Sequence, residues 1–193
     1  RAPGGAPPPP PPALFSRPLG FPACRSVPVQ HCAFAYALVL DGTSFGRLAY
    51  SGDCRPSPRF AAAARGADVL VHEATFEDDL REEAVKKKHS TVSEALEIGE
   101  RMGAKAVVLT HFSQRYPKIP ALPERAKETE GERTRAPVIF AFDFLTLRPH
   151  TLSMASKVTP ALRLLYPDDD RYNVDNDEIG LGTRIDAKGT ILQ

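Results

Sequence analysis

The sequence has few cysteines, almost no net charge and no long apolar run. Its three cysteines are an odd number without CxxC spacing, which argues against both a disulfide framework and a cysteine zinc site. A reducing compartment fits this cysteine usage best. The formal net charge of +1 gives no sign of nucleic-acid binding, although a local basic groove can lie within a neutral whole. No run approaches the roughly 18 apolar residues of a membrane span, so no membrane partner is expected.

The chain also lacks the short-range histidine pairs of many zinc enzymes, HxH and HExxH. A catalytic zinc usually takes three protein ligands, and a two-metal site takes more. This absence counts against a complete zinc site within these 193 residues.

Proline is concentrated at the N-terminus, where ten of the 19 prolines fall within the first 28 residues. We expect residues 1–28 to be a disordered or polyproline segment. The segment lacks the apolar centre of a secretory signal. Because the first residue is Arg, we expect that the chain starts within a gene or was processed. At the other end, residues 151–193 are expected to form a weakly ordered acidic tail.

Apolar segments that alternate with helical patterns predict an α/β domain. Two helices are expected between the third and fourth strands, the second opened by the capping box Thr91-x-x-Glu94 and closed by Gly103. A short Ala-rich helix before Gly66 and another over 123–131 are also expected. The expected strands of a single sheet are 33–40, 46–51, 68–72, 105–110 and 137–147.

The first of the two central helices carries a stripe of Phe76, Leu80 and Ala84. Its acidic residues come first and its lysines last, which matches the helix dipole at both ends. We expect this helix to act as a rigid spacer that returns the chain, so that His89 can meet Glu73. The three lysines at its end, 86–88, suit a solvated helix end or a phosphate contact.

Ionisable residues stand at the ends of several expected strands. Asp53, His72 and His111 follow strands, and His31 precedes one. Ligands bind at the carboxyl ends of strands in open α/β sheets, and His31 reaches the same edge if its strand is antiparallel. Histidine nitrogens and a carboxylate oxygen at one edge would suit zinc. The alternative is that each is a hydrogen-bonded structural residue.

Glu73 and His89 also allow two interpretations. Glu73 either pairs locally as a structural group, or orients a histidine that donates a proton. Near His111, the residues Ser113 and Arg115 suit a phosphate substrate but could equally be surface residues.

Three segments carry a family resemblance: "YSGDCRPS", "ADVLVHEATFEDDLREEAVKKKHST" and "VVLTHFSQRYPKIP". In this order and at these intervals they resemble ribonuclease Z, the metallo-β-lactamase-fold endonuclease that removes 3′ trailers from precursor tRNA. The resemblance covers roughly residues 28 to 170 and is to the C-terminal part of the long eukaryotic form. It implies that residues 29–150 form half of an αββα sandwich, a mixed sheet with helices on its outer face.

The resemblance also implies roles for individual residues. His31 and His111 would each bind one of two zincs, and Asp53 would bridge both. Glu73 and His89 would form a carboxylate–histidine pair in which His89 donates a proton toward the scissile phosphate or the leaving oxygen. His72 becomes a structural residue on this interpretation.

For the substrate, the resemblance implies that Ser113 and Arg115 contact phosphate and that Asp143 lies near the tRNA acceptor end. The chain departs from the family in lacking the upstream HxHxDH motif and the substrate-gripping arm. We therefore expect it to be incomplete and inactive alone, with precursor tRNA and the missing N-terminal part of the protein as partners.

The expected location is intracellular, in the nucleus or mitochondrion or both, with the cytosol also possible. Two other functions stay open: another phosphodiesterase of the same fold, and a non-catalytic remnant or interaction domain.

Overall fold

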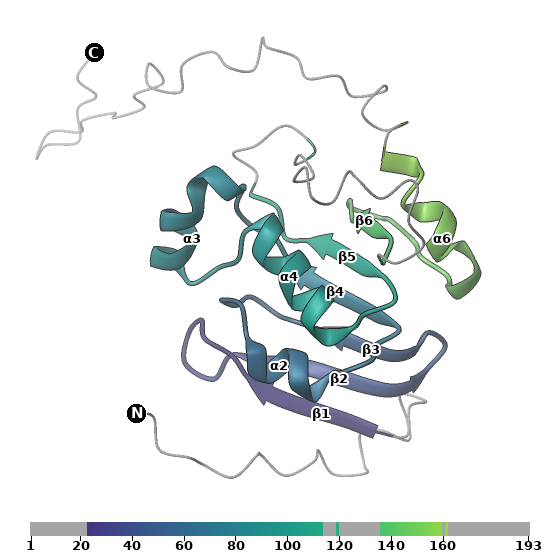
Figure 1. The fold of residues 1–193 in the computed structure, drawn as a ribbon, viewed down its shortest axis with the longest axis horizontal. Coiled ribbons are helices and arrows are strands. Elements are labelled where there is room, and N and C mark those ends of the chain that lie inside the picture. Colours follow the sequence, from purple (N-terminus) through teal and green to yellow (C-terminus); the bar gives the residue numbers. More distant parts are fainter. Residues whose placement is uncertain (1–22, 114–118, 120–135, 160, 162–193) are drawn as a thin grey trace, which may run out of the picture.

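The computed structural model describes residues 23–113, 119, 136–159 and 161, which contain one six-stranded mixed sheet (Figure 1). Strands that follow one another in sequence are neighbours in the sheet. The first three are antiparallel and the last four are parallel. This arrangement confirms the α/β class with a mixed sheet. The strands are β1 (Ala23–Pro28), β2 (Tyr36–Thr43), β3 (Gly46–Tyr50), β4 (Val69–Glu73), β5 (Val107–Thr110) and β6 (Val138–Phe140).

Helices α2 (Pro58–Ala63) and α4 (Val92–Met102) cover one face of the sheet (Figure 1). Their apolar side chains and those of the strands form the main core, in which Phe60, Ile98 and Met102 are fully buried. The capping box predicted at the start of α4 is present. The shorter elements are η1 (Asp78–Leu80), α3 (Arg81–Lys87), η2 (Pro149–Thr151) and α6 (Leu152–Ala155).

The opposite face of the sheet is covered only in part. Around β4, β5 and β6 it packs against residues near α6, among them Leu147 and Leu152. On β2 and β3, however, Tyr36 and Tyr50 remain 42% and 43% exposed. These side chains belong to the face opposite α2, because their neighbours Ala37 and Ala49 are fully buried in the core with α2 and α4.

We expect the isolated 193-residue chain to be marginally stable or prone to aggregation, because this apolar face lies open to water. Thermal unfolding followed by circular dichroism would test the expectation and should show a broad transition at low temperature. A sharp, cooperative transition at high temperature would contradict it.

Strands β1, β2 and β6 differ most from the predictions. Residues 23–28 form the edge strand β1, hydrogen-bonded to β2 along its length, so the expected N-terminal disorder is wrong for this stretch. Strand β2 begins at Tyr36 rather than at 33, because Phe34 takes a left-handed conformation with φ of 62°. Strand β6 is only three residues long, because the chain turns at Phe142 to Leu145 and Phe144 is also left-handed.

The helix expected to contain Phe76 begins later. The Phe76 backbone accepts from the N–H of Val92 and donates to the carbonyl of Ser90, so Phe76 pairs with the segment before α4. The helical turns begin only at Asp78, and the stripe of Phe76, Leu80 and Ala84 is therefore not one helical face. The chain nevertheless returns as expected and brings His89 to Glu73.

Other expectations fall outside the described residues. These are the structure of residues 1–22, the short helix over 123–131, the position of Arg115 and the tail from 162 to 193. Between 149 and 155 the structure shows the short elements η2 and α6. None of the described helices has the length and apolar character needed to cross a membrane.

Candidate active site

The candidate residues lie at one edge of the sheet. Strands β3, β4 and β5 are parallel, and their carboxyl ends lead to Asp53, Glu73 and His111. Strand β2 is antiparallel to β3, so the β1–β2 loop reaches the same edge and carries His31 there. His89 comes from the loop between α3 and α4. The structure thus brings together five residues that span 81 positions of sequence, from 31 to 111.

Two left-handed backbone positions shape this edge. Gly52, directly before Asp53, has φ of 56°, and a Cβ there would lie 3.1 Å from the carbonyl oxygen of Tyr36. A glycine therefore lets the Asp53 loop pass close to β2. His111 is also left-handed, with φ of 61°, a conformation that side chains other than glycine seldom adopt. Strain of this kind often occurs at functional sites.

Glu73 is a buried carboxylate, 1% exposed, that accepts hydrogen bonds from three loops. The backbone N–H groups of Cys54 and Ser90 donate to it at 2.8 and 3.0 Å. The Thr75 hydroxyl and backbone N–H donate to its Oε2 at 2.7 and 3.2 Å. His89 lies with Nδ1 2.8 Å from its Oε1. This number of donors explains how a carboxylate is accommodated without water contact.

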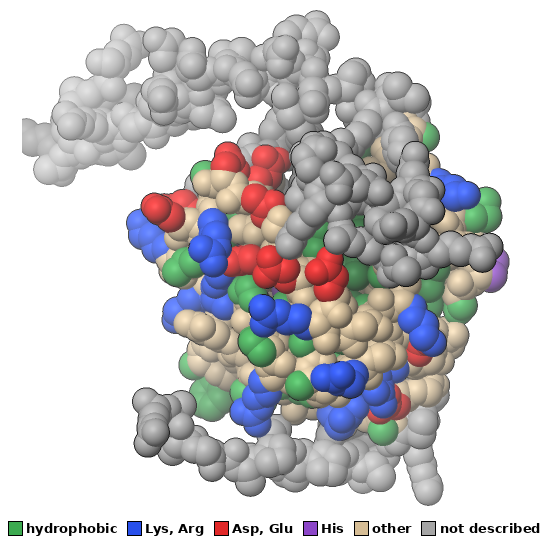
Figure 2. Space-filling model, in the orientation of Figure 1, with side chains coloured by type: hydrophobic (Ala, Val, Ile, Leu, Met, Phe, Trp, Pro, Cys, Tyr) green, Lys and Arg blue, Asp and Glu red, His purple; other side chains and the backbone are tan. Residues whose placement is uncertain are grey.

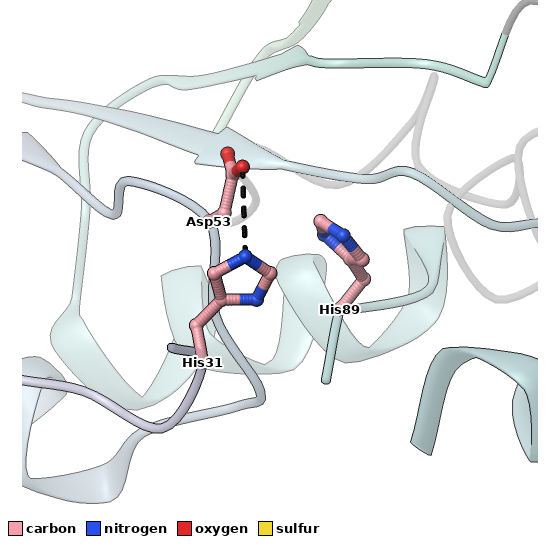
Figure 3. Close-up of side chains that lie close together, drawn as sticks. All are labelled: His31, Asp53 and His89. Atoms are coloured by element: carbon pink, nitrogen blue, oxygen red, sulfur yellow. Dashed lines mark ion pairs between the residues drawn. The ribbon is translucent and has the colours of Figure 1, made fainter. Parts of the chain in front are cut away.

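The three histidine rings stand next to one another. The centroid of His89 lies 4.7 Å from that of His31 and 5.3 Å from that of His111. Figure 3 shows His31 and Asp53 pointing toward each other, with the ring of His89 beside them. An ionised carboxylate only accepts hydrogen bonds, so Nδ1 of His89 carries the proton that is donated to Glu73. This contact leaves Nε2 of His89 available to a substrate.

The hydrogen-bond partners also assign the proton on His111. The single hydroxyl proton of Thr75 is donated to Glu73, so its oxygen must accept from Nδ1 of His111, which lies 2.7 Å away. Nδ1 of His111 therefore carries a hydrogen. In the neutral ring, Nε2 then presents a lone pair.

The same argument holds for His31. Its Nδ1 lies 3.0 Å from the backbone carbonyl of Lys88, an acceptor only, so Nδ1 is the donor and Nε2 presents a lone pair. Lys88 ends α3 in a left-handed conformation, with φ of 60°, and this turns its carbonyl toward the site. A histidine whose far nitrogen is held by a carbonyl is the usual form of a metal ligand.

Both Nε2 lone pairs face one oxygen of Asp53. Oδ2 of Asp53 lies 3.9 Å from Nε2 of His31 and 3.6 Å from Nε2 of His111. These distances are too long for direct hydrogen bonds. Ligand atoms of one tetrahedral zinc, each about 2.0–2.2 Å from the metal, lie roughly 3.3–3.5 Å apart. Each histidine Nε2 thus lies near ligand spacing from Asp53, but His31, Asp53 and His111 do not form one compact group. Among the described residues, the groups whose ligand atoms all lie within 4.8 Å of one another are His31 with Asp53 and His89, and Glu73 with His89 and His111.

His72 and Cys54 belong to the fold rather than to this donor set. His72 is fully buried, burial lowers its pKa, and its Nδ1 donates to the Glu73 carbonyl, so the first expectation from its strand-end position is wrong. Burial, together with the nearby charges of Glu73 and Asp53, raises the pKa of Cys54 to about 12. Its thiol is therefore neutral and cannot serve as a nucleophile near pH 7.

The expected substrate contacts lie at or beyond the border of the described residues. Ser113 follows His111 at the same edge, and its N–H donates to the carbonyl of Thr75 at 3.2 Å. Asp143 is exposed in the turn after β6. Arg115 is outside the described residues.

Two residues with a part in the site were not predicted from the sequence. Thr75 connects Glu73 to His111, and its only signal is its place in the HEAT segment, two residues after the glutamate. Arg55 donates a hydrogen bond from Nη1 to the backbone carbonyl of His89. No local pattern marks it, because its carboxylate partner is Glu94, 39 residues away.

The surface over the helices carries both signs of charge. Acidic side chains gather over α3 and α4, and lysine and arginine side chains lie mainly toward α2 and the strands below it (Figure 2). This face shows no continuous basic stripe, in keeping with the net charge of +1.

Comparisons with known proteins identify the fold. A family model described as "Beta-lactamase superfamily domain" matches residues 19–112. A crystal structure of a long form RNase Z from yeast has a TM-score of 0.66 and 32% identity, covering 77% of this chain and 20% of that one. Together with the mixed sheet and the polar residues at its edge, these matches define a metallo-β-lactamase fold.

Within that superfamily the sequence is similar to ribonuclease Z. The chain is 44% identical to "Ribonuclease Z 1" of Schizosaccharomyces pombe over 130 residues, which are 67% of this chain and 15% of that protein. It is 39% identical to the mitochondrial "tRNase Z TRZ3" of Arabidopsis thaliana, over 81% of this chain and 18% of that protein. A "Zinc phosphodiesterase ELAC protein 2 homolog" of Caenorhabditis elegans is 40% identical, over 74% of this chain and 16% of that protein.

These matches confirm the resemblance to ribonuclease Z that the sequence motifs predict. The chain spans less than a fifth of the length of each of these three relatives, at 15%, 18% and 16%.

Proposed function

We propose that this chain is the C-terminal part of a zinc-dependent endoribonuclease that removes 3′ trailers from precursor tRNA. The observation that carries the proposal is the pair of histidine Nε2 atoms that face one oxygen of Asp53, beside the buried Glu73 and its partly buried partner His89. Similarity to proteins named ribonuclease Z and zinc phosphodiesterase supports the same conclusion.

His31, Asp53 and His111 would hold zinc through two Nε2 atoms and the carboxylate. Asp53 lies between the two histidines, which suits the bridging role that the family resemblance implies. When bound, zinc supplies Lewis-acid polarisation of a phosphoryl oxygen and a potent nucleophile at neutral pH. The carbonyl of Lys88 and the hydroxyl of Thr75 fix the two rings in the orientation that leaves Nε2 free.

His89 would be the proton donor. Its Nδ1 is held by Glu73, so the proton available to the substrate is the one on Nε2. The Glu73 carboxylate, 2.8 Å from Nδ1, fixes the orientation of the ring. Transfer of that proton to the leaving oxygen of the scissile phosphodiester would complete the cleavage.

Ser113, Arg115 and Asp143 are proposed substrate contacts. Ser113 is supported by its place beside His111, and Asp143 by its exposure after β6. The roles of all three follow from the family resemblance.

Three donors are fewer than a two-zinc site requires. We propose that the remaining ligands come from an N-terminal part of the same protein, which would also cover the open face of β2 and β3, and that this chain is inactive alone. The Arabidopsis relative is named mitochondrial, which supports a mitochondrial location; nuclear and cytosolic locations stay predictions.

The test begins with the transcript upstream of the Arg1 codon. If an open frame continues into an HxHxDH motif, the full gene product should cleave a precursor tRNA that bears a 3′ trailer, and a zinc chelator should abolish the cleavage. Cleavage of a simple phosphodiester such as bis(p-nitrophenyl) phosphate without cleavage of the precursor would favour another phosphodiesterase. Activity on neither would favour a non-catalytic protein and overturn the proposal.

A further inference from the structure

Arg55 lies two residues after Asp53 and extends behind the site rather than into it. Its side chain is 13% exposed and makes a bidentate ion pair with Glu94, with Nη1–Oε2 at 2.7 Å and Nη2–Oε1 at 2.6 Å. A paired, planar contact of this kind holds both side chains in one orientation.

The same arginine contacts the loops of two candidate site residues. Nη1 donates a second hydrogen bond to the backbone carbonyl of His89. The backbone N–H of Arg55 donates to the carbonyl of Gln30 at 2.9 Å, directly before His31. One residue thus connects the Asp53 loop with the loops that carry His31 and His89, whose ring centroids lie 4.7 Å apart.

Glu94 anchors this contact to helix α4. Its carboxylate also accepts the backbone N–H of Thr91 at 3.1 Å, and the Thr91 hydroxyl accepts the N–H of Glu94 at 3.3 Å. Burial by itself raises the pKa of Glu94, but the hydrogen bonds from Arg55 and Thr91 outweigh it and the pKa is lowered. Glu94 is therefore ionised at neutral pH and forms a fixed point at the start of α4.

We propose that Arg55 is a positioning residue for the reaction: its bond to Glu94 aims the guanidinium at the His89 carbonyl and holds the His89 loop against the Asp53 and His31 loops. The statement that Arg55 serves a reaction rests on the proposed function. The contacts of Arg55 with Glu94, His89 and Gln30 are independent of it. Arg55 contacts none of the candidate donor atoms, so it acts through the backbone of His89.

A purely structural role is the competing explanation. Buried ion pairs often contribute little net stability, and apolar residues can replace them. An apolar pair at 55 and 94 would therefore keep the fold but leave the His89 carbonyl without its donor. Comparing this double variant with the single Arg55 variant thus separates a displaced His89 loop from a loss of folding stability.

The variants are Arg55→Met, Arg55→Lys and the double variant Arg55→Met with Glu94→Met, all in the full gene product. Arg81, whose Nε lies 3.2 Å from Glu94, remains to offset the glutamate charge in the single variants. The matched control is Arg47→Met, because Arg47 also binds a carboxylate, Asp41, and a backbone carbonyl, that of Arg65 at 2.8 Å. Arg47 is the second residue of β3, at the end of that strand away from the site.

The first readout needs no substrate. Hydrogen–deuterium exchange should show the Ser90 amide, which donates to Glu73, exchanging at least about 10-fold faster in Arg55→Met and in the double variant. The control should leave it unchanged. Apparent zinc affinity, measured by chelator competition, should fall about 10- to 100-fold in the same two variants.

The second readout is cleavage of precursor tRNA. Arg55→Met should lower kcat about 10- to 100-fold with little change in KM, since a displaced proton donor affects the transition state. Arg55→Lys should recover part of the loss, because lysine can reach one acceptor at a time. The double variant should recover thermal stability but not kcat.

Unchanged Ser90 exchange, or a kcat that recovers together with stability in the double variant, would overturn the positioning role. If the unsubstituted gene product cleaves no precursor tRNA, the proposed function fails, and the exchange and zinc measurements still decide the role of Arg55.

Discussion

Replacing Glu73 by glutamine is expected to slow cleavage about 100- to 10,000-fold and to lower the free energy of unfolding by about 3 kcal/mol or more. The glutamate is 1% exposed and accepts from backbone N–H groups, the Thr75 hydroxyl and His89. A glutamine has the same shape but turns one acceptor into a donor. At least one amide hydrogen must then face another donor inside the protein, where no water is available to accept a hydrogen bond from either group.

The loss of activity has a separate physical cause. Without the carboxylate, the acceptor that holds the Nδ1 proton of His89 is weakened, and the ring is no longer fixed in one orientation. Misplaced or missing general acids typically lower rates by about 100- to 10,000-fold. Single-turnover cleavage of precursor tRNA by the full gene product measures this effect, and unfolding in urea measures the stability.

Glu100→Gln is the matched control for this prediction. Glu100 lies on helix α4 and is exposed, so the same chemical change there should leave both quantities within about 0.5 kcal/mol and a factor of two. Should the Glu73 variant be as stable as the control, the buried hydrogen-bond cluster around Glu73 would not have the importance assigned to it.

The sequence predicts the sheet edge well because strand ends are visible as transitions from apolar runs to polar residues. The runs "DVLV" and "AVVLT" predict that His72 and His111 lie at the same edge as soon as the strands are assumed parallel. The edge is right, but the next residue, Glu73, takes part in the site, whereas His72 is buried in the fold. Strand β1 was missed because the composition around it is rich in proline, while its residues 23–27 contain none. The neighbouring strand β2 supplies the hydrogen bonds that make this stretch extended.

The side-chain relations within the site cannot be predicted in the same way. Which nitrogen of His31 carries a proton depends on the Lys88 carbonyl, 57 residues away, and on the left-handed end of α3. The contact of Arg55 with Glu94 joins residues with no shared periodicity. Long-range polar pairs of this kind appear only once the loops have been placed in three dimensions.

Replacing Asp53 by asparagine is expected to separate metal binding from stability. Its Oδ2 faces the Nε2 atoms of His31 and His111 at 3.9 and 3.6 Å, beyond hydrogen-bond distance, and its side chain is 39% exposed. Little folding energy depends on it, and the unfolding free energy should change by less than about 1 kcal/mol. Loss of an indirect metal contact costs about 10- to 100-fold in affinity, so loss of the carboxylate ligand should exceed about 100-fold.

The control, Asp68→Asn, should behave in the opposite way. Asp68 accepts from Lys105 and from the Arg47 backbone at 2.7 Å each, and the Lys105 contact, followed by that of Arg47, lowers its pKa. A carboxyl whose folded pKa lies below its unfolded value stabilises the fold above that value and loses this contribution as pH falls through the folded pKa. At neutral pH, Asp68→Asn should therefore cost more stability than Asp53→Asn while zinc affinity stays unchanged.

Both variants are best compared in the full gene product, by chelator competition for zinc and unfolding in urea at pH 7. The expected result is a crossed pattern, in which Asp53→Asn loses zinc and cleavage but keeps its stability, whereas Asp68→Asn keeps zinc and cleavage but loses stability. If Asp53→Asn retains zinc affinity within a factor of three, the Nε2 atoms of His31 and His111 that face Asp53 do not form a metal site with it. Asp53 would then be one more polar residue at the edge of the sheet, and the zinc-dependent mechanism would lose its structural basis.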